Sequence, residues 1–104
     1  MNGLKDIISN ESSFKIELIF VLVLLPILYL LPLDILYKLV MFMALMGILI
    51  AEAINSAIER VTDLVTLDYH EMAGRAKDAG SAVVFLSIVV CAVVWGFCFM
   101  HIFF

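Results

Sequence analysis

The stretch EAINSAIERVTDLVTLDYHEMAGRAKD, residues 52–78, decides how this chain is organised, because it places ionisable side chains between two long apolar runs, 39–51 and 80–104. On a helix, polar residues spaced by three and four fall on one face. Four residues here have that spacing: Glu52, Asn55, Ser56 and Glu59. Polar groups beside hydrocarbon are costly and usually face the interior of a helix bundle at a functional site. The sequence therefore predicts a functional polar face at a membrane boundary.

The composition is typical of an integral membrane protein. Of the 104 residues, 65% are hydrophobic, and the mean hydropathy is +1.19. Soluble domains have an apolar content of only about 45–50%. A chain of this length forms a single domain, residues 1–104. The net charge of −4 and the lack of a basic stripe exclude a nucleic-acid-binding surface. Cys91 and Cys98 lie within the last apolar run, which predicts packing residues.

Three apolar segments predict three transmembrane helices, at about residues 16–33, 35–59 and 80–104. Pro26 is expected to bend the first helix. Tight turns are expected at Pro32 and near residues 67–69. Before the first span, three apolar residues share a helical face and predict a short amphipathic helix on the membrane surface: Leu4, Ile7 and Ile8. The predicted fold is an all-α membrane protein with three spans and an N-terminal surface helix.

Small residues predict where these helices approach closely, because they let backbones come together within a membrane. Gly47 and Ala51 lie four residues apart, and a second small group begins at Gly80 with Ser81 and Ala82. Trp95 lies too deep in the last span to be an ordinary interfacial anchor.

The basic residues predict the orientation. With three spans, the N-terminus and residues 52–78 share one side of the membrane. That side carries five of the six basic residues: Lys5, Lys15, Arg60, Arg75 and Lys77. The positive-inside rule therefore places the polar face toward the cytoplasm.

The polar face carries the groups that phosphoryl transfer to a lipid requires: carboxylates for a divalent metal, a cation for phosphate and a base for a hydroxyl. Glu52 is the best candidate for the base, because it lies closest to the hydrocarbon. Glu59, about 10.5 Å further along the helix, is a candidate metal ligand. Asn55 can orient either carboxylate, and Lys77 can neutralise phosphate. The same residues would also suit an ion or proton pathway, and spacing alone does not separate the two.

Simpler structural explanations exist for several of these residues. Glu59 would also suit a solvated face where a helix leaves the membrane, and Lys77 with Asp78 would suit an interfacial anchor. An isolated histidine such as His70 is more often a surface or capping residue than a ligand. The chain has neither the P-loop motif nor a protein-kinase glycine-rich loop, so any nucleotide site must be of another type.

Several motifs nevertheless form a recognisable set: EAINSAIE at 52–59, DYH at 68–70 and GRAKDAGSA at 74–82, together with Asp63. A weaker block, NESSFKIE at 10–17, follows Gly3-Leu4-Lys5. These motifs resemble the small bacterial integral-membrane diacylglycerol kinases and their relatives, the undecaprenol kinases. The resemblance covers nearly the whole chain and favours a kinase over a pathway. It implies ATP-dependent phosphorylation of diacylglycerol by a homotrimer whose active sites are shared between neighbouring subunits.

The resemblance also implies roles for individual residues. Glu52 matches the general base, and Asn55 matches a residue that supports the catalytic centre. Glu11 and Glu59 match acidic residues that bind Mg²⁺ together with ATP. The residues that match nucleotide contacts are Asp68, Tyr69, His70, Lys77 and Asp78. The residues that match positions near the lipid substrate are Ser13, Phe14, Lys15, Ile16, Glu17, Lys38 and Ser81, with Glu52 itself.

Three departures from the family pattern are visible. The amphipathic residues that the family usually has before its Gly-Leu-[Lys/Arg] element do not occur in this sequence. Ser12-Ser13 replaces a small apolar pair, and Asp68 stands where the family often has Glu. For the substrate, residues 74–81 resemble the diacylglycerol enzymes of Gram-negative bacteria, which favours diacylglycerol. DLVT at 63–66 resembles the undecaprenol kinases, so undecaprenol is the alternative substrate. A non-enzymatic membrane protein is the alternative from another class.

Overall fold

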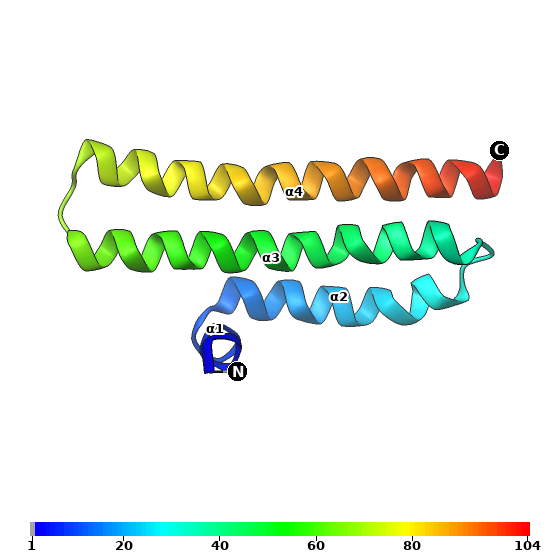
Figure 1. The fold of residues 1–104 in the computed structure, drawn as a ribbon, viewed down its shortest axis with the longest axis horizontal. Coiled ribbons are helices and arrows are strands. Elements are labelled where there is room, and N and C mark those ends of the chain that lie inside the picture. The colour runs from blue at the N-terminus through cyan, green and yellow to red at the C-terminus, as the bar shows by residue number, and fades with distance from the viewer. Residues whose placement is uncertain (1) are drawn as a thin grey trace.

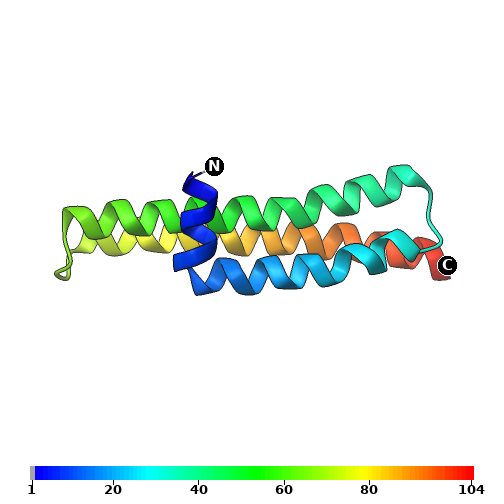
Figure 2. The same ribbon diagram turned by 90° about the horizontal axis from the view of Figure 1, so that it is seen from below.

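The computed structural model describes residues 2–104 as four helices: α1 (Asn2–Asn10), α2 (Ser12–Leu30), α3 (Ile35–Val65) and α4 (Glu71–Phe103). Helices α2, α3 and α4 run along the long axis of the molecule, with α3 in the middle (Figure 1). Helix α1 runs across them at the level where α2 begins (Figure 2). The all-α fold is confirmed, and α2, α3 and α4 are each long and apolar enough to cross a membrane.

The three long helices differ in length, and the difference positions the polar face. Helix α2 has 19 residues, about 28 Å at 1.5 Å per residue, close to the roughly 30 Å of a bilayer's hydrocarbon. Helix α3 has 31 residues and α4 has 33, so both exceed that thickness. The excess lies at the end where they are joined, beyond α1 (Figure 1). This projecting hairpin contains the turn at residues 66–70, where a turn was predicted.

The helix boundaries differ from the predicted spans for local reasons. Helix α2 ends at Leu30 rather than near residue 33. Leu31 precedes Pro32 and takes an extended backbone, with φ −66° and ψ 142°, because a residue before proline is disfavoured in the helical region. Pro26 lies inside α2 without ending it. Helix α4 begins at Glu71 because His70 caps it: His70 Nδ1 accepts a hydrogen bond from the Met72 N–H at 3.1 Å.

The core consists of two apolar clusters between the helices. The larger contains Phe14, Val21, Leu45, Ile48, Leu49 and Cys91. The smaller contains Leu28, Met41 and Cys98. Both cysteines are buried, in agreement with their predicted role in packing. Many other large apolar side chains on α2, α3 and α4 are exposed, as expected for helices that face lipid or other helices.

Close approach of the helices occurs at one of the two predicted glycine positions. A Cβ at Gly80 would overlap the side chain of Asn55 on α3, whereas nothing lies within 4 Å of a Cβ at Gly47. The contact predicted at Gly80 is therefore present, and the contact predicted at Gly47 is not made within this chain.

Trp95 has a partner that explains its depth. Its indole Nε1 donates a hydrogen bond to the Met41 carbonyl oxygen at 3.2 Å, linking α4 to α3. A buried indole N–H usually needs such a partner.

Replacing Trp95 with phenylalanine is expected to lower the free energy of unfolding by about 1 kcal/mol, the typical net value of one hydrogen bond. Unfolding followed in mixed micelles with increasing dodecyl sulfate measures this difference. Phe85→Leu, at an exposed position on the same helix, is the control. Equal stability of Trp95→Phe and the parent protein would show that the bond contributes nothing.

Candidate active site

One face of α3 carries the polar residues that the helical spacing brings together. Glu52 is 8% exposed and Ser56 is 6% exposed, while Asn55 and Glu59 are half-buried. Ile54 and Ala57, which the helical period places elsewhere, are exposed. The predicted polar face therefore exists and faces the interior of the molecule.

Glu52 is buried without a fixed partner among the described residues. Its carboxylate makes no hydrogen bond or ion pair with any of residues 2–104. The charges that act on it are the carboxylates of Glu17, on α2, and Glu59. Both carboxylates add negative charge near Glu52. Such an environment suits a group that must accept a proton.

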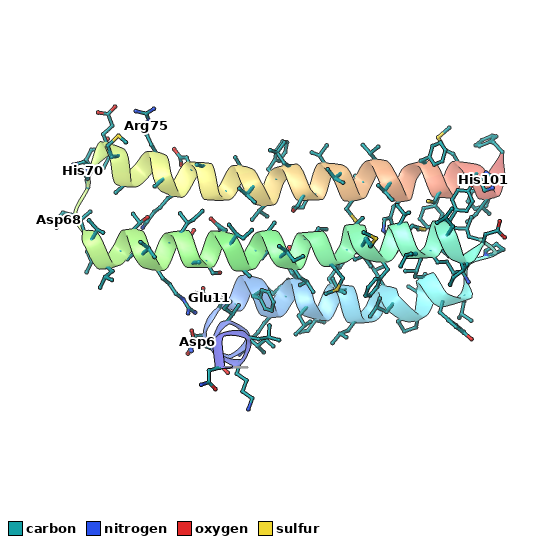
Figure 3. All side chains as sticks on the ribbon, viewed as in Figure 1. Asp6, Glu11, Asp68, His70, Arg75 and His101 are labelled. Carbon is teal, nitrogen blue, oxygen red and sulfur yellow. The ribbon has the colours of Figure 1, made fainter. Side chains whose placement is uncertain are left out.

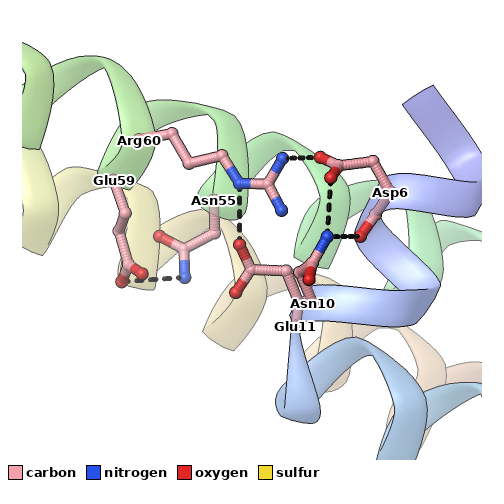
Figure 4. Close-up of polar contacts among 6 residues, drawn as sticks. All are labelled: Asp6, Asn10, Glu11, Asn55, Glu59 and Arg60. Atoms are coloured by element: carbon pink, nitrogen blue, oxygen red, sulfur yellow. Dashed lines mark hydrogen bonds and ion pairs between the residues drawn. The ribbon is translucent and has the colours of Figure 1, made fainter. Parts of the chain in front are cut away.

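Asn55 connects Glu59 to α4. Its Nδ2 donates a long hydrogen bond of 3.5 Å to Glu59 Oε1 (Figure 4). Its Oδ1 is buried without a hydrogen-bond partner among the described residues and lies against the backbone of Gly80. Asn55 is therefore held where its amide can orient the Glu59 carboxylate, and Gly80 provides the space.

Glu11 is brought to this region by the break between α1 and α2 (Figure 3). Its Oε1 accepts a hydrogen bond of 2.8 Å from Nε of Arg60, whose Nη1 also bonds to Asp6 on α1 (Figure 4). Sequence reasoning missed Arg60 as a site residue. It lies eight residues after Glu52 and four after Ser56, at the edge of the polar face, but nothing in the sequence indicates that α1 would cross α3 at this residue.

The donor set of this region fits magnesium. Across residues 2–104, no three histidine, cysteine or acidic side chains converge to hold a metal ion by themselves. Mg²⁺, however, is commonly held by one or two carboxylates together with substrate phosphate oxygens. Glu11 and Glu59 provide two carboxylates from the two chain segments that Figure 4 shows together. Two carboxylates alone would leave the coordination of the ion incomplete, and nucleotide phosphate oxygens would have to supply further ligands.

Replacing Glu59 with glutamine is expected to raise the Mg²⁺ concentration needed for half-maximal rate at least roughly tenfold, because one oxygen ligand loses its charge. Initial rates measured against free Mg²⁺ test this expectation, with the oligomeric state in detergent unchanged. Asp34→Asn is the control, since Asp34 lies at the opposite end of α3 and its side chain makes no capping bond. An unchanged Mg²⁺ requirement in Glu59→Gln would remove Glu59 from the metal site.

The predicted nucleotide contacts gather at the projecting end of α3 and α4. A surface pocket of about 360 Å³ is lined by four of them, Asp68, Tyr69, His70 and Lys77, together with residues of the turn. Lys77 Nζ forms an ion pair with Asp63 Oδ1 at 2.6 Å. Asp78, which follows Lys77 in the chain, is exposed. The structure thus brings the basic and aromatic candidates together around one polar pocket.

The residues predicted to contact the lipid lie in several different environments. Glu17 lies close enough to Glu52 to act on it, and four further candidates are exposed: Ser13, Lys15, Ile16 and Ser81. Phe14 is 3% exposed and packs in the larger core cluster. Lys38 lies about 21 Å from Glu52 along α3. Its Nζ donates a hydrogen bond to the Tyr29 carbonyl oxygen at 2.7 Å, so the structure does not bring it to the polar face.

Comparison with known proteins reveals one family. The sequence profile described as "Prokaryotic diacylglycerol kinase" matches residues 1–99. Diacylglycerol kinase of Escherichia coli (strain K12) is 39% identical over 93 residues, covering 89% of this chain and 76% of that protein. Diacylglycerol kinase of Haemophilus influenzae is 34% identical over 96 residues, covering 92% and 81%. Diacylglycerol kinase of Pseudomonas aeruginosa is 35% identical over 86 residues, covering 83% and 70%. The profile match includes every candidate site residue named above.

Proposed function

The chain belongs to the prokaryotic diacylglycerol kinase family and is a lipid kinase, and from this premise we propose that it transfers the γ-phosphate of ATP to diacylglycerol at the cytoplasmic face of the inner membrane. The observation that carries the proposal is the position of Glu52. Its carboxylate is buried, close enough to interact with Glu17 near the start of α2, and it shares a helical face with Asn55 and Glu59. A lipid hydroxyl at the membrane surface would reach the same depth.

In the proposed reaction, Glu52 accepts the proton of the lipid hydroxyl. The hydroxyl oxygen then forms a bond to the γ-phosphorus as the bond to the bridging oxygen breaks, giving phosphatidic acid and ADP. General base catalysis of this kind contributes about 10²–10⁴-fold to a rate. Burial of Glu52, which is 8% exposed, limits the access of competing water.

Glu11 and Glu59 would hold Mg²⁺ together with the phosphates of ATP. When bound, the ion neutralises negative charge on the transferring phosphoryl group. Lys77 would exchange its partner Asp63 for a phosphate oxygen. Asp68, Tyr69, His70 and Asp78 would contact the rest of the nucleotide at the projecting end of α3 and α4.

We further propose that α1 lies on the cytoplasmic membrane surface and that the enzyme is a homotrimer. Helix α1 crosses the others at the N-terminal start of α2, where the apolar part of that helix begins (Figure 2). Five of the six basic residues lie on this side of the molecule, which supports a cytoplasmic orientation. The extensive exposed apolar surface of α2, α3 and α4 would be shared between lipid and neighbouring subunits that complete the site.

The decisive experiment compares two lipid alcohols in mixed micelles. Purified protein is incubated with Mg²⁺ and γ-labelled ATP, with either diacylglycerol or undecaprenol. Preferential labelling of diacylglycerol is the expected result. Preferential labelling of undecaprenol, which the DLVT segment at 63–66 favours, would replace the substrate and retain the mechanism. Labelling of neither lipid would overturn the proposal.

A further inference from the structure

Arg60 connects α3 to both parts of the N-terminal segment. Its Nε donates to Glu11 Oε1 at 2.8 Å and its Nη1 bonds to Asp6 Oδ2 (Figure 4). Asp6 is itself held by Asn10, whose Nδ2 donates to Asp6 Oδ1 at 2.7 Å and to its backbone carbonyl oxygen at 3.1 Å. A guanidinium is a planar fork with donors at fixed angles. Arg60 therefore sets the position of the Glu11 carboxylate relative to α1 and α3 together.

The side chains of Arg60, Asp6 and Glu11 are too exposed to stabilise the fold strongly, so their role is geometric. The side chains of Arg60, Asp6 and Glu11 are 41%, 47% and 27% exposed. Ion pairs with this much access to water contribute little to the stability of the fold. The two ion pairs of Arg60 therefore add little to the stability of the fold, but they fix the orientation of the Glu11 carboxylate.

Glu11 has no other restraint on its side chain among the described residues. It is the N-cap residue of α2, with an extended backbone (φ −111°, ψ 107°), but its side chain makes no capping hydrogen bond. Arg60 occupies Oε1, and Oε2 accepts no hydrogen bond from residues 2–104. The oxygen left available has hard-donor character, which suits a divalent cation.

We propose that Arg60 is a positioning residue for the metal–nucleotide site, because it fixes one oxygen of Glu11 and leaves the other available to the metal. This inference rests on the proposed function, in which Glu11 and Glu59 hold Mg²⁺ with ATP. Without Arg60, the Glu11 side chain would have to be ordered by the metal itself, at a cost in conformational entropy. The effect should therefore appear in metal affinity rather than in folding.

Asp6 anchors the other arm of Arg60. The hydrogen bond from Arg60 and the weaker one from Asn10 hold the pKa of Asp6 below its ordinary value. A lowered pKa means that the anchoring interaction is fully present at neutral pH and is lost only as the pH falls through that lowered value. Arg60 thus stays bonded to α1 at neutral pH.

The direct test measures metal binding without turnover. Mn²⁺ binding to the full-length protein in detergent is followed by electron paramagnetic resonance with a non-hydrolysable ATP analogue. Arg60→Gln is expected to weaken Mn²⁺ binding about tenfold, and Arg60→Lys to recover part of the loss. Arg75→Gln makes the same charge change at an exposed residue whose hydrogen bond goes to the Met72 sulfur. Its Mn²⁺ affinity should equal that of the parent.

Two further variants separate positioning from general electrostatics. In a Glu11→Gln background, Arg60→Gln should have no additional effect on Mn²⁺ affinity, because the residue through which it acts is already altered. Asp6→Asn leaves the Arg60–Glu11 bond in place. It should accelerate amide hydrogen exchange in residues 2–10 and change Mn²⁺ affinity by less than about twofold.

Three results would overturn the inference: unchanged Mn²⁺ affinity in Arg60→Gln, an equal loss when Glu11 is already glutamine, or a parent protein that binds no Mn²⁺ with nucleotide. Failure of the proposed function is distinguishable from these. A protein that phosphorylates neither lipid but shows the expected Arg60 dependence of Mn²⁺ binding would retain the inference and lose the proposed reaction.

Discussion

Glu52→Gln is expected to lower kcat by roughly 10³-fold while the KM for ATP stays close to that of the parent protein. Glutamine keeps the shape of the side chain but cannot accept the hydroxyl proton. Because Glu52 makes no hydrogen bond or ion pair within residues 2–104, its replacement leaves no polar partner unsatisfied. The variant should therefore fold and assemble as the parent does.

The measurement is the initial rate of label transfer from γ-labelled ATP to diacylglycerol, with both substrates varied. Asp34→Asn removes a carboxylate from the opposite end of α3, where no capping bond is lost, and should retain the parent rate. Equal kcat in Glu52→Gln and the parent would exclude Glu52 as the base. In that event the mechanism would require a different proton acceptor on the polar face.

Gly80→Ala is expected to lower kcat about 100-fold, the cost of a displacement of about 1 Å in a catalytic group. A Cβ at Gly80 would overlap Oδ1 of Asn55 and lie 3.4 Å from Cδ1 of Ile58. The Asn55 amide is the end of a side chain and can rotate away, so the helices need not separate. Rotation, however, breaks its hydrogen bond to Glu59. We therefore expect the substitution to lower kcat.

Two other helical glycines, Gly47 on α3 and Gly96 on α4, offer a contrast that isolates the steric effect. Alanine is favoured over glycine inside a helix by about 1 kcal/mol, so propensity alone predicts a gain at any helical glycine. Nothing lies within 4 Å of a Cβ at Gly47 or Gly96. Alanine at those positions should therefore leave the rate within about twofold of the parent.

Combining Gly80→Ala with Asn55→Ala tests whether the loss of activity acts through the Asn55 amide. When Asn55 is already alanine, Gly80→Ala should cause no further loss, because the displaced amide is absent. Two results would count against this explanation: full activity of Gly80→Ala, or an equal loss with and without the Asn55 amide. Stability followed in dodecyl sulfate should change by less than about 1 kcal/mol in every case.

The features that could be predicted from the sequence are those set by local rules. The spacing of Glu52, Asn55, Ser56 and Glu59 predicted a shared face, because helical geometry alone determines which residues align. Apolar length predicted three long helices, and the turn at 66–70 was located correctly. The end of α2 was placed too late, although the restriction that Pro32 imposes on Leu31 was available in the sequence.

The features that could not be predicted depend on how separate elements meet. Gly47 and Gly80 have equivalent small-residue patterns, yet only the second faces a side chain of another helix. The bond between Arg60 and Glu11 requires the direction in which α1 leaves α2, and no periodicity records that direction. His70 was weighed as a capping residue or a nucleotide contact. The structure gives it the first role and also places it on the polar pocket.

The crosswise position of α1 has a consequence for how the enzyme tolerates different membranes. If α1 lies at one water–lipid boundary, as proposed above, the depth of Glu52 is set from that boundary and not from the bilayer midplane. A thicker or thinner bilayer would then be accommodated at the far end, around the turn at residues 31–34, where Lys38 can extend toward water. Hydrophobic mismatch would then be accommodated far from Glu52. The hydroxyl of a lipid at the membrane surface would therefore meet the same carboxylate in membranes of different thickness.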